Sequence, residues 1–362
     1  MKKAFIFILP LLIVALIAIG AALTAAPVKK PKLDSEHFVI ASWNVENLFD
    51  AEDDPRSEGD DEYTPGKWTS WTDERYRMKL TNLTEIISEM APDILVLTEV
   101  ENRRVLNDLC EILKNVRKYP MDNIIHRDSS DFRGIDVAML SRLKPEQVTW
   151  IESGPGLRDS PMAEFVVKGK KLFVIGNHWK SHYVAKGSTK KESDQARERM
   201  ASCVRKGYQT ILREDPNAAI LVMGDFNDNL DGLAPGIAGF SLDMDEVLSS
   251  GTNLFCLSSL LPDDRKSRGT YYYSRDKTWN SFDTINVSRG LLTSDPSLAS
   301  PWIVQTNSYE IYATPKQRFG TNGPSYKAEA PYPFRKLRVD GKWKFCTGYS
   351  DHFPVRVVIQ AR

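Results

Sequence analysis

The pattern of apolar and polar positions predicts short buried strands that alternate with amphipathic helices. In residues 72–90, apolar side chains recur at helical spacing and share one face, and similar spacing recurs in 105–116 and 190–212. Elsewhere, short apolar runs end in polar residues, which is typical of buried strands. The predicted strands are residues 38–43, 93–98, 135–140, 147–151, 163–167, 172–176, 221–223, 270–273, 282–287 and 355–359.

The order of these elements favours one domain. Several strands follow one another closely, notably across Gly169, which favours antiparallel hairpins. No linker, internal repeat or low-complexity segment interrupts residues 36–362. We therefore expect an α/β (α+β) fold over residues 29–362, a β-sandwich of two sheets flanked by helices. Residues 50–71 are acidic and irregular, which is typical of a solvated loop.

The first residues are predicted to lie outside this domain. Two lysines precede an almost unbroken apolar run at 4–26, and further lysines follow it. This pattern is typical of a secretory signal peptide, and Thr24 and Ala26 are small residues suited to a cleavage point. Because the run is long enough to span a bilayer, an uncleaved membrane anchor is the alternative. Either interpretation of residues 1–28 predicts that the domain is extracytoplasmic.

Charge and cysteine content narrow the function. Lys plus Arg number 48 and Asp plus Glu also number 48, so no global field draws the chain to nucleic acid or anionic lipid. No C-x-x-C spacing occurs, which argues against a zinc–thiolate site. Disulfides are possible, but the sequence does not choose among the pairings, and Cys203 is expected to be a buried thiol. The four cysteines are Cys110, Cys203, Cys256 and Cys346.

Polar side chains follow six of the predicted apolar strands. The stretch from Leu221 to Asp228 is the clearest case, because an apolar run ends in Asp and Asn residues, and Gly224 is expected to turn the backbone there. In α/β proteins, the ends of strands commonly carry the chemistry, although a single polar residue there is usually a turn former. The residues concerned are Asn44, Glu99, Asn177, His178, Asp225, Asn227, Asp283, Asp351 and His352.

Taken together in this order, these segments resemble the endonuclease/exonuclease/phosphatase superfamily, which has the deoxyribonuclease I-like fold. The resemblance covers almost the whole chain after the N-terminal segment, and NVENLFD with NHWKS is most similar to the bacterial extracellular-nuclease-like branch. It implies metal-dependent hydrolysis of phosphate esters. The matching motifs are WNVENLFD, ILVLTEVEN, RGIDVAML, VIGNHWKSH, MGDFND, GTYYY with Trp279 and Asp283, and YSDHFPV.

The residue types suit a hard divalent cation. Phosphodiesters are anions that repel hydroxide, so a catalyst needs a cation to neutralise the non-bridging oxygens. Mg²⁺ prefers oxygen ligands and retains several waters, so one or two carboxylates and an amide suffice, and Mn²⁺ or Ca²⁺ could take its place. Glu99 is the first choice as ligand, and Asn44 and Asp351 are expected to share the ion or its waters.

The resemblance implies that Asp283 pairs with His352. Such a carboxylate fixes the imidazole tautomer and raises its pKa, so that His352 acts as a base or, when charged, binds a phosphoryl oxygen. Asp225 is expected to orient or deprotonate the attacking water, and Asn227 to donate to a non-bridging oxygen. The sequence does not decide whether Asp225 or His352 takes the proton.

Further residues have supporting roles. His178 matches a second catalytic histidine of the family, with Asn177 beside it and Lys180 as a phosphate contact, while Asp136 is a structural support. The chain departs from many relatives by having Thr98 before the metal-binding Glu and Thr284 after the second Asp. Both departures bear on the phosphate pocket and so on the substrate.

Three functions compete. The first is a nuclease or phosphodiesterase, favoured by cations at Lys180, His182, Lys186, Lys190 and Lys191. The second is a phosphatase or a phospholipase C-type hydrolase, similar to a sphingomyelinase or inositol phosphatase, favoured if the acidic loop 52–62 borders the cleft. The third, a non-catalytic binding module, is disfavoured because all the reacting groups are present. No obligate protein partner is inferred.

Overall fold

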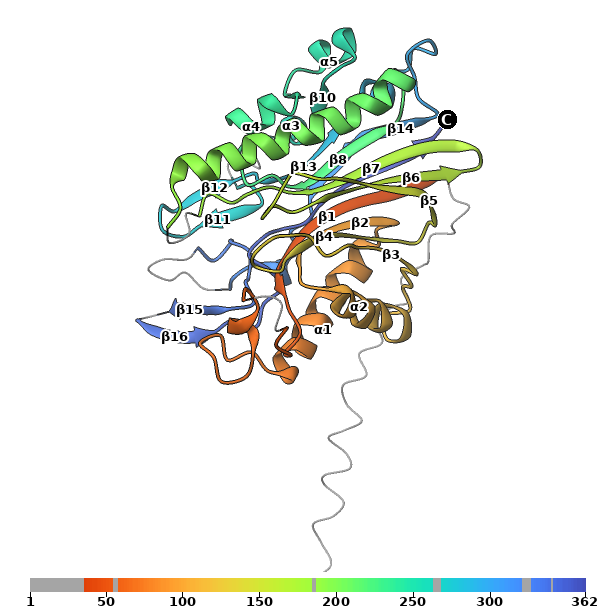
Figure 1. Ribbon diagram of the computed structural model, residues 1–362. Coiled ribbons are helices and arrows are strands. Elements are labelled where there is room, and N and C mark those ends of the chain that lie inside the picture. The colour runs from red at the N-terminus through yellow and green to blue at the C-terminus, as the bar shows by residue number, and fades with distance from the viewer. Residues whose placement is uncertain (1–35, 55–57, 184–186, 263–267, 321–326, 340) are drawn as a thin grey trace, which may run out of the picture. The chain divides into compact units, whose positions relative to one another are not determined.

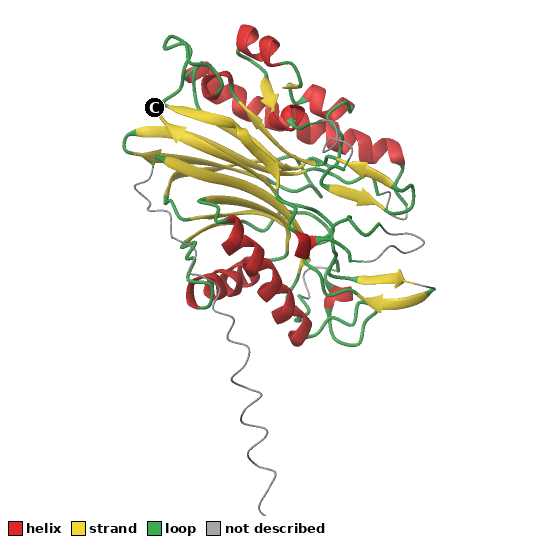
Figure 2. Ribbon diagram, turned by 180° about the vertical axis from the view of Figure 1, so that it is seen from behind, coloured by secondary structure: helices red, strands yellow, loops and turns green. Residues whose placement is uncertain are grey.

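The computed structural model describes residues 36–362 except for 55–57, 184–186, 263–267, 321–326 and 340. Two sheets pack face to face, and helices cover their outer faces (Figures 1 and 2). The predicted leader at 1–28 lies outside the described residues. Among the residues described, no helix combines the length and the apolar character that a membrane span requires.

The first sheet contains the N-terminal strand of the domain. Strands β1 and β2 are parallel, and the other neighbours in this sheet are antiparallel. The six strands lie in the order β14 (Trp302–Ile311), β17 (Val355–Ala361), β1 (His37–Leu48), β2 (Ile94–Val100), β4 (Asp136–Ser141) and β3 (Asn123–Ile125).

The second sheet contains the stretch with the clearest chemistry. Strands β7 and β8 are parallel, as are β9 and β10, and the remaining neighbours are antiparallel. The seven strands lie in the order β5 (Pro145–Ile151), β6 (Ser160–Val167), β7 (Lys170–His178), β8 (Ile220–Asp225), β13 (Asp283–Val287), β10 (Leu254–Cys256) and β9 (Phe240–Ser241).

The main helices begin at side-chain caps. Thr72 and Asn102 accept backbone N–H groups at the starts of α1 (Asp73–Met90) and α2 (Arg103–Asn115), and Thr189 forms a capping box before α3 (Lys190–Glu214). The shorter elements are α4 (Leu233–Ile237), α5 (Met244–Ser250), the 3₁₀ turns η1 (Asp61–Tyr63), η2 (Leu257–Leu260), η3 (Arg289–Leu291) and η4 (Pro315–Gln317), and two ribbons, β11 (Tyr271–Tyr273) with β12 (Thr278–Asn280) and β15 (Lys336–Val339) with β16 (Lys342–Phe345).

Alternation along the strands builds three buried layers. On β2, Ile94 and Val96 face the other sheet, whereas Leu95 and Leu97 face α1 and α2. On β8, Leu221 and Met223 belong to the layer between the sheets, while Ile220 and Val222 pack under α3. Central strands buried on both faces need an unbroken apolar run, which is why the sequence reveals them.

Each predicted strand and helix overlaps an observed element, but the sequence missed the edge strands β14, β3 and β9 and the neighbouring strand β10. Strand β14 was missed because polar residues interrupt it, and its register with β17 shifts between Gln305 and Glu310. The solvated-loop prediction for 50–71 is wrong at Trp71, which is buried. Cys203 is half-buried rather than buried, and all four cysteines are free thiols.

Candidate active site

The register of the second sheet brings three predicted residues into one row. His178 pairs with Asp225 across the parallel strands β7 and β8, and Asp283 pairs with Asp225 across β13 and β8. The sequence predicted a turn at Gly224, but Gly224 continues β8. A Cβ atom on Gly224 would lie 1.9 Å from the carbonyl oxygen of Asn177, so only glycine allows this close approach of β7.

An irregularity in the first sheet aims Glu99 at the same row. Strands β1 and β2 pair regularly up to Asn44 and Thr98, and the register then shifts. Glu46, Asn47 and Glu99 lie in the left-handed region, with φ of 56°, 56° and 64°. Such bulges redirect side chains near active sites. Here the Asn47 backbone N–H donates to Glu99 Oε2 at 2.9 Å and fixes the carboxylate.

Asn44 joins the two sheets through its amide. Its Nδ2 donates to Asp225 Oδ2 at 2.8 Å and to Glu99 Oε1 at 3.3 Å. Its Oδ1 accepts the backbone N–H of Glu46 at 2.9 Å. The amide nitrogen, not the oxygen, therefore faces the carboxylates. In this arrangement Asn44 positions Glu99 and Asp225, rather than offering the ligand oxygen that the sequence analysis expected.

His352 and Asp283 form a buried pair. His352 Nδ1 lies 2.7 Å from Asp283 Oδ2, and its Nε2 lies 3.9 Å from Asp225 Oδ2. Burial alone would lower the pKa of His352, but the carboxylates of Asp283 and Asp225 outweigh it and raise the pKa to about 10. Burial and the nearby Asp283 carboxylate raise the pKa of Asp225 to about 7. This raised pKa favours the charged form of the His352 imidazole at neutral pH.

His178 is the opposite kind of histidine. Its Nε2 lies 3.7 Å from Asp225 Oδ2 and 4.0 Å from Glu99 Oε1. Burial, together with the nearby cations Arg158 and Arg133, holds its pKa well below the usual value. Its Nδ1 has no hydrogen-bond partner among the described residues. A neutral imidazole in this place can donate to a phosphate oxygen without adding charge.

Two more predicted residues, Asn227 and Asp351, line one pocket together with Glu99, His178, Asp225 and His352. The Asn227 backbone N–H donates to Asp225 Oδ1 at 2.8 Å, and its Nδ2 donates to the Trp179 carbonyl at 3.0 Å. Asp351 Oδ2 accepts a hydrogen bond from Arg335 Nη1 at 2.6 Å. Asp351 therefore faces the pocket as a carboxylate that is already shared with a guanidinium.

The structure does not bring Asn177 or Lys180 to the pocket. Asn177 is fully buried, and its Oδ1 accepts from Ser160 Oγ at 3.0 Å and from Trp179 Nε1 at 3.3 Å. Lys180 Nζ lies over the ring of Phe132, 5.1 Å from its centroid. Neither residue lines the pocket, so no observed contact supports the phosphate role predicted for them.

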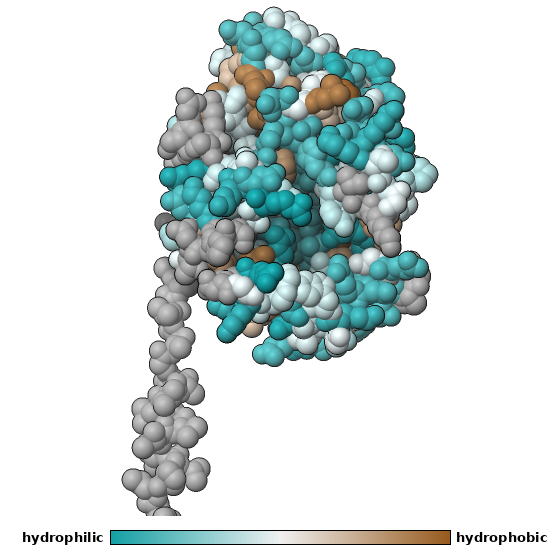
Figure 3. Space-filling model, turned by 90° about the vertical axis from the view of Figure 1, so that its left-hand side faces the viewer, coloured by the Kyte–Doolittle hydropathy of each residue, from teal (hydrophilic) through white to brown (hydrophobic). Residues whose placement is uncertain are grey.

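This pocket, which we call the catalytic pocket, has a volume of about 610 Å³ and lies where the two sheets meet the ribbon β11–β12 and Arg335, which precedes β15. Figure 3 views the molecule from the left-hand side of Figure 1, and the hollow on that face is mainly hydrophilic. Three arginines that were not predicted from the sequence also line it, namely Arg133, Arg158 and Arg335. Of these, Arg133 stands in the quoted motif RGIDVAML, whereas the other two lie in segments without a periodic pattern.

A buried lysine ties the two catalytic segments together. Lys79 on α1 is fully buried, and its Nζ donates to the carbonyls of Glu46 at 2.8 Å and Tyr349 at 3.4 Å. Burial lowers the pKa of Lys79 to about 8. Ser350 Oγ adds a second link, because it donates to the Asn44 carbonyl at 2.6 Å. Lys79 is thus a positioning residue for the segments that carry Asn44 and His352.

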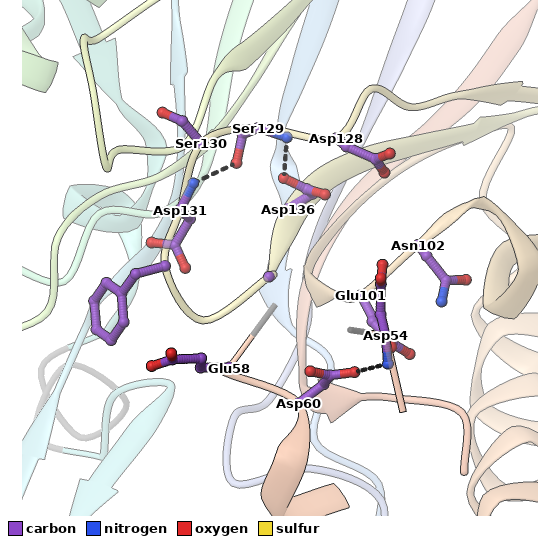
Figure 4. Close-up of a pocket in the computed structure, with 12 residues that line it drawn as sticks. Asp54, Glu58, Asp60, Glu101, Asn102, Asp128, Ser129, Ser130, Asp131 and Asp136 are labelled. Carbon is purple, nitrogen blue, oxygen red and sulfur yellow. Dashed lines mark hydrogen bonds between the residues drawn. The ribbon is translucent and has the colours of Figure 1, made fainter. Parts of the chain in front are cut away.

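A second pocket lies beside the catalytic one. It has a volume of about 580 Å³, and Asp136 lines it together with other acidic residues (Figure 4). Asp136 accepts from the Ser129 N–H at 2.9 Å and lies 3.2 Å from His126 Nε2, which fits the supporting role expected for it. We call this the acidic pocket. The acids that line it are Asp54, Glu58, Asp60, Glu101, Asp128, Asp131 and Asp136.

Comparison with known proteins identifies the family and supports the fold. The model of the endonuclease/exonuclease/phosphatase family matches residues 39–361. Similar solved structures include an endonuclease/exonuclease/phosphatase family protein from Bacteroides thetaiotaomicron (15% identity, 89% of this chain and 97% of that one, TM-score 0.51). Others are the mannosyl-6-phosphatase Bt3783 of the same organism (16%, 89% and 99%, 0.51) and a truncated Caenorhabditis elegans TDP2 (16%, 90% and 98%, 0.50).

These structural similarities are low in sequence identity and establish the fold alone. No curated protein matches the chain. The family model covers nearly all of the described domain, including each segment that reaches the catalytic pocket. The chain therefore belongs to the endonuclease/exonuclease/phosphatase family, whose members are hydrolases acting on phosphoester bonds.

Proposed function

We propose that this protein is a divalent-metal-dependent phosphodiesterase that cleaves nucleic acid. The observation that carries the proposal is the His352–Asp283 pair, 2.7 Å apart, with Asp225 between His352 and His178. With a charged imidazole on one side of the Asp225 carboxylate and a neutral one on the other, these groups can bind a phosphate and transfer a proton in the same step.

The donor atoms fit a hard divalent cation. Glu99 and Asp225 come from different sheets, yet both accept from the amide nitrogen of Asn44, so their carboxylates converge. Oxygen donors of this kind suit Mg²⁺, with Mn²⁺ and Ca²⁺ as alternatives. We assign Glu99 as the main ligand and Asp351 as a second. Bound there, the cation would neutralise charge on the non-bridging phosphate oxygens.

Asp225, His352 and Asn227 are assigned the proton transfer and the phosphate contact. Asp225 accepts from Asn44 and Asn227, which fixes its carboxylate, and its raised pKa suits a group that takes a proton from water. Since His352 is already charged, it acts as a donor to the phosphoryl oxygen rather than as the base. Asn227 orients Asp225 through its N–H, and this contact supports its assignment to the site.

His178 and Arg133 complete the phosphate contacts. The Nε2 of His178 faces Glu99 and Asp225, and both His178 and Arg133 line the pocket. Arg133 is held by a hydrogen bond to Asn47 Oδ1. A guanidinium is suited to bidentate contact with phosphate oxygens. We propose that His178 assists the leaving oxygen and that Arg133 binds a non-bridging oxygen.

A small phosphoester is the second candidate substrate, in a phosphatase or a phospholipase C-type reaction. The observation in its favour is that the acidic loop borders the site, because a Cβ atom on Gly59 would lie 2.2 Å from the Arg133 Cα atom. An acidic rim repels a long polyanion. For location, we propose an extracytoplasmic protein on the basis of residues 1–28.

A substrate panel tests the proposal. The purified protein is assayed in Mg²⁺ or Mn²⁺ with single-stranded DNA, plasmid, RNA, sphingomyelin, inositol phosphates and bis-nitrophenyl phosphate. We expect cleavage of nucleic acid that EDTA abolishes and that Glu99→Gln and His352→Ala each reduce. Turnover of lipid or monoester with nucleic acid left intact would favour the second candidate. Unchanged turnover in both variants would refute the assignment of the site.

A further inference from the structure

Two large aromatic side chains are exposed next to the catalytic pocket. Trp68, which precedes α1, and Trp343 on β16 are 53% and 61% exposed. Their ring centroids lie 4.9 Å apart with an interplanar angle of 81°. Exposed tryptophans in contact with each other are uncommon on a protein surface that binds nothing. The pair therefore marks a surface for interaction.

This surface is continuous with the catalytic pocket. A groove of about 240 Å³ lies at its base, lined by Trp68, Phe345 and Lys336 among others. Asn47 and Arg335 line both this groove and the catalytic pocket. A chain that leaves the catalytic pocket over Arg335 would enter the groove directly. We call Trp68, Trp343, Lys336 and Arg338, together with the groove, the tryptophan surface.

This surface carries one more cation than acid, with Arg335, Lys336 and Arg338 against Glu46 and Glu62. Across the ribbon β15–β16, Arg338 pairs with Trp343 and Lys336 pairs with Phe345, so these four residues share one face. Lys336 Nζ lies 5.2 Å from the centroid of the Trp68 ring and donates to Ser70 Oγ at 2.7 Å. The negative charges on this surface are Glu62 and the buried Glu46, which line the groove.

On this face Arg338 is exposed, whereas the exposed Lys342 and Lys344 alternate with Trp343 along β16 and lie on the opposite face of the ribbon. A cationic ribbon with aromatic rings beside it suits a strand of nucleic acid, because the bases have faces that stack and the phosphates need cations. A flat bilayer would meet the exposed rings but would not enter the groove beneath them. The recessed shape and its continuity with the catalytic pocket therefore favour a single flexible strand.

We propose that the tryptophan surface binds the nucleotides adjacent to the scissile phosphate of a single-stranded nucleic acid. One or two bases stack on Trp68 and Trp343, and the intervening phosphates face Arg338 and Arg335. This inference rests on the proposed function and deepens it, because it makes a single-stranded polynucleotide the preferred substrate class.

The test compares a long substrate with a minimal one. We measure kcat/KM for a single-stranded oligonucleotide and for bis-nitrophenyl phosphate, which is too small to reach the tryptophans, and take the ratio. In Trp68→Ala/Trp343→Ala we expect this ratio to fall about tenfold or more, since each stacked base contributes substantially to binding. Trp343→Phe should lower this ratio less than Trp343→Ala does, because phenylalanine still stacks.

The matched control is Leu242→Ala, which removes an apolar side chain that is 50% exposed between β9 and α5 and lines neither pocket. Its ratio should equal that of the wild type. An unchanged ratio in the double tryptophan variant overturns the inference. It does so even if this variant loses binding to vesicles of phosphatidylglycerol and phosphatidylcholine. If the wild type turns over neither the oligonucleotide nor bis-nitrophenyl phosphate, the proposed function itself fails.

Discussion

The catalytic pocket and the acidic pocket lie on opposite sides of one short segment and use the same residue types differently. Phe132 and Gly134 line the acidic pocket, whereas Arg133 between them lines the catalytic one. Buried carboxylates converge in both. In the catalytic pocket, Asp225 and Asp283 face amides and imidazoles at hydrogen-bonding distance.

In the acidic pocket, the carboxylates on the loop side have a different environment. Within the described residues, Asp60 and Glu101 accept only backbone N–H groups, from Asp54 and Asp50, each at 2.7 Å. Burial, with Asp50, Asp60 and Asp54 nearby, raises the pKa of Glu101 to about 8. The difference teaches that a cluster of buried acids becomes a candidate active site through its partners rather than through the number of its carboxylates.

The largest effect should follow the loss of His352. We expect His352→Ala to reduce kcat by about 10³-fold or more, because it removes both a donor to the phosphoryl oxygen and the partner of Asp283. Asp128→Asn, which changes an exposed acid of the acidic pocket, should leave kcat within twofold (roughly) of the wild type. Steady-state kinetics on the preferred substrate measure kcat of both variants. An equal fall in kcat would contradict the assignment of catalysis to the catalytic pocket alone.

Glu99→Gln should give the next largest effect. The amide keeps the size of the side chain but removes the charge assigned to the divalent cation, so we expect kcat/KM to fall by about 10²- to 10³-fold. The concentration of Mg²⁺ that gives half-maximal activity should rise as well. Titration of activity with Mg²⁺ measures both quantities. An unaltered Mg²⁺ dependence would remove Glu99 as the ligand.

Lys79→Met should have a smaller but clear effect. Methionine fills the space of the lysine stem but cannot donate to the carbonyls of Glu46 and Tyr349, so the catalytic segments lose their link. We expect kcat to fall about 10- to 100-fold, the usual cost of removing a supporting contact. Arg77→Met, which removes an exposed cation from the same helix, is the control. Equal kcat in the two variants would contradict the positioning role.

Glu101→Gln should raise stability and leave the chemistry alone. The pKa of Glu101 rises from 4.5 to about 8 on folding. Between these pH values the unfolded chain releases a proton that the folded chain retains, so folding is destabilised as pH rises towards 8. The glutamine variant escapes this penalty and still accepts from Asp50.

We expect the free energy of unfolding of Glu101→Gln to exceed that of the wild type by roughly 1–3 kcal/mol at pH 8, with the gap closing near pH 4.5. Denaturant melts at several pH values measure it. Glu111→Gln, an exposed change on α2, serves as the control. A gap that grows as pH falls would have the wrong sign for this account.

The sequence predicted the central strands and the residues at their ends because both leave local signals. An apolar run followed by Asp225 or His352 can be recognised without knowing the rest of the fold. The amide orientation of Asn44 could not be predicted, since it depends on Glu46 and on Asp225 from the other sheet. Arg158 and Arg335 also lacked a signal, because their positions depend on loops that pack only in the finished fold.

Lys79 is an instructive intermediate case. It lies three residues after the buried Tyr76 and four before the buried Leu83, so helical spacing alone places it on the inner face of α1. A lysine there is ordinarily a solvated side chain whose stem lies along the surface. The ammonium group is buried here because it donates to the Glu46 carbonyl at the bulge in β1 and to the Tyr349 carbonyl.

The left-handed backbone at Glu46, Asn47, Glu99 and Asn227 has a consequence for protein engineering. Outside glycine, this conformation costs on the order of 1 kcal/mol per residue. Asn47, Glu99 and Asn227 line the catalytic pocket, and Glu46 lines the adjoining groove. Replacing any of them with glycine would relieve the backbone while discarding a side chain that aligns the site. Selection for thermostability alone would therefore accumulate such glycines and yield a stable protein without activity.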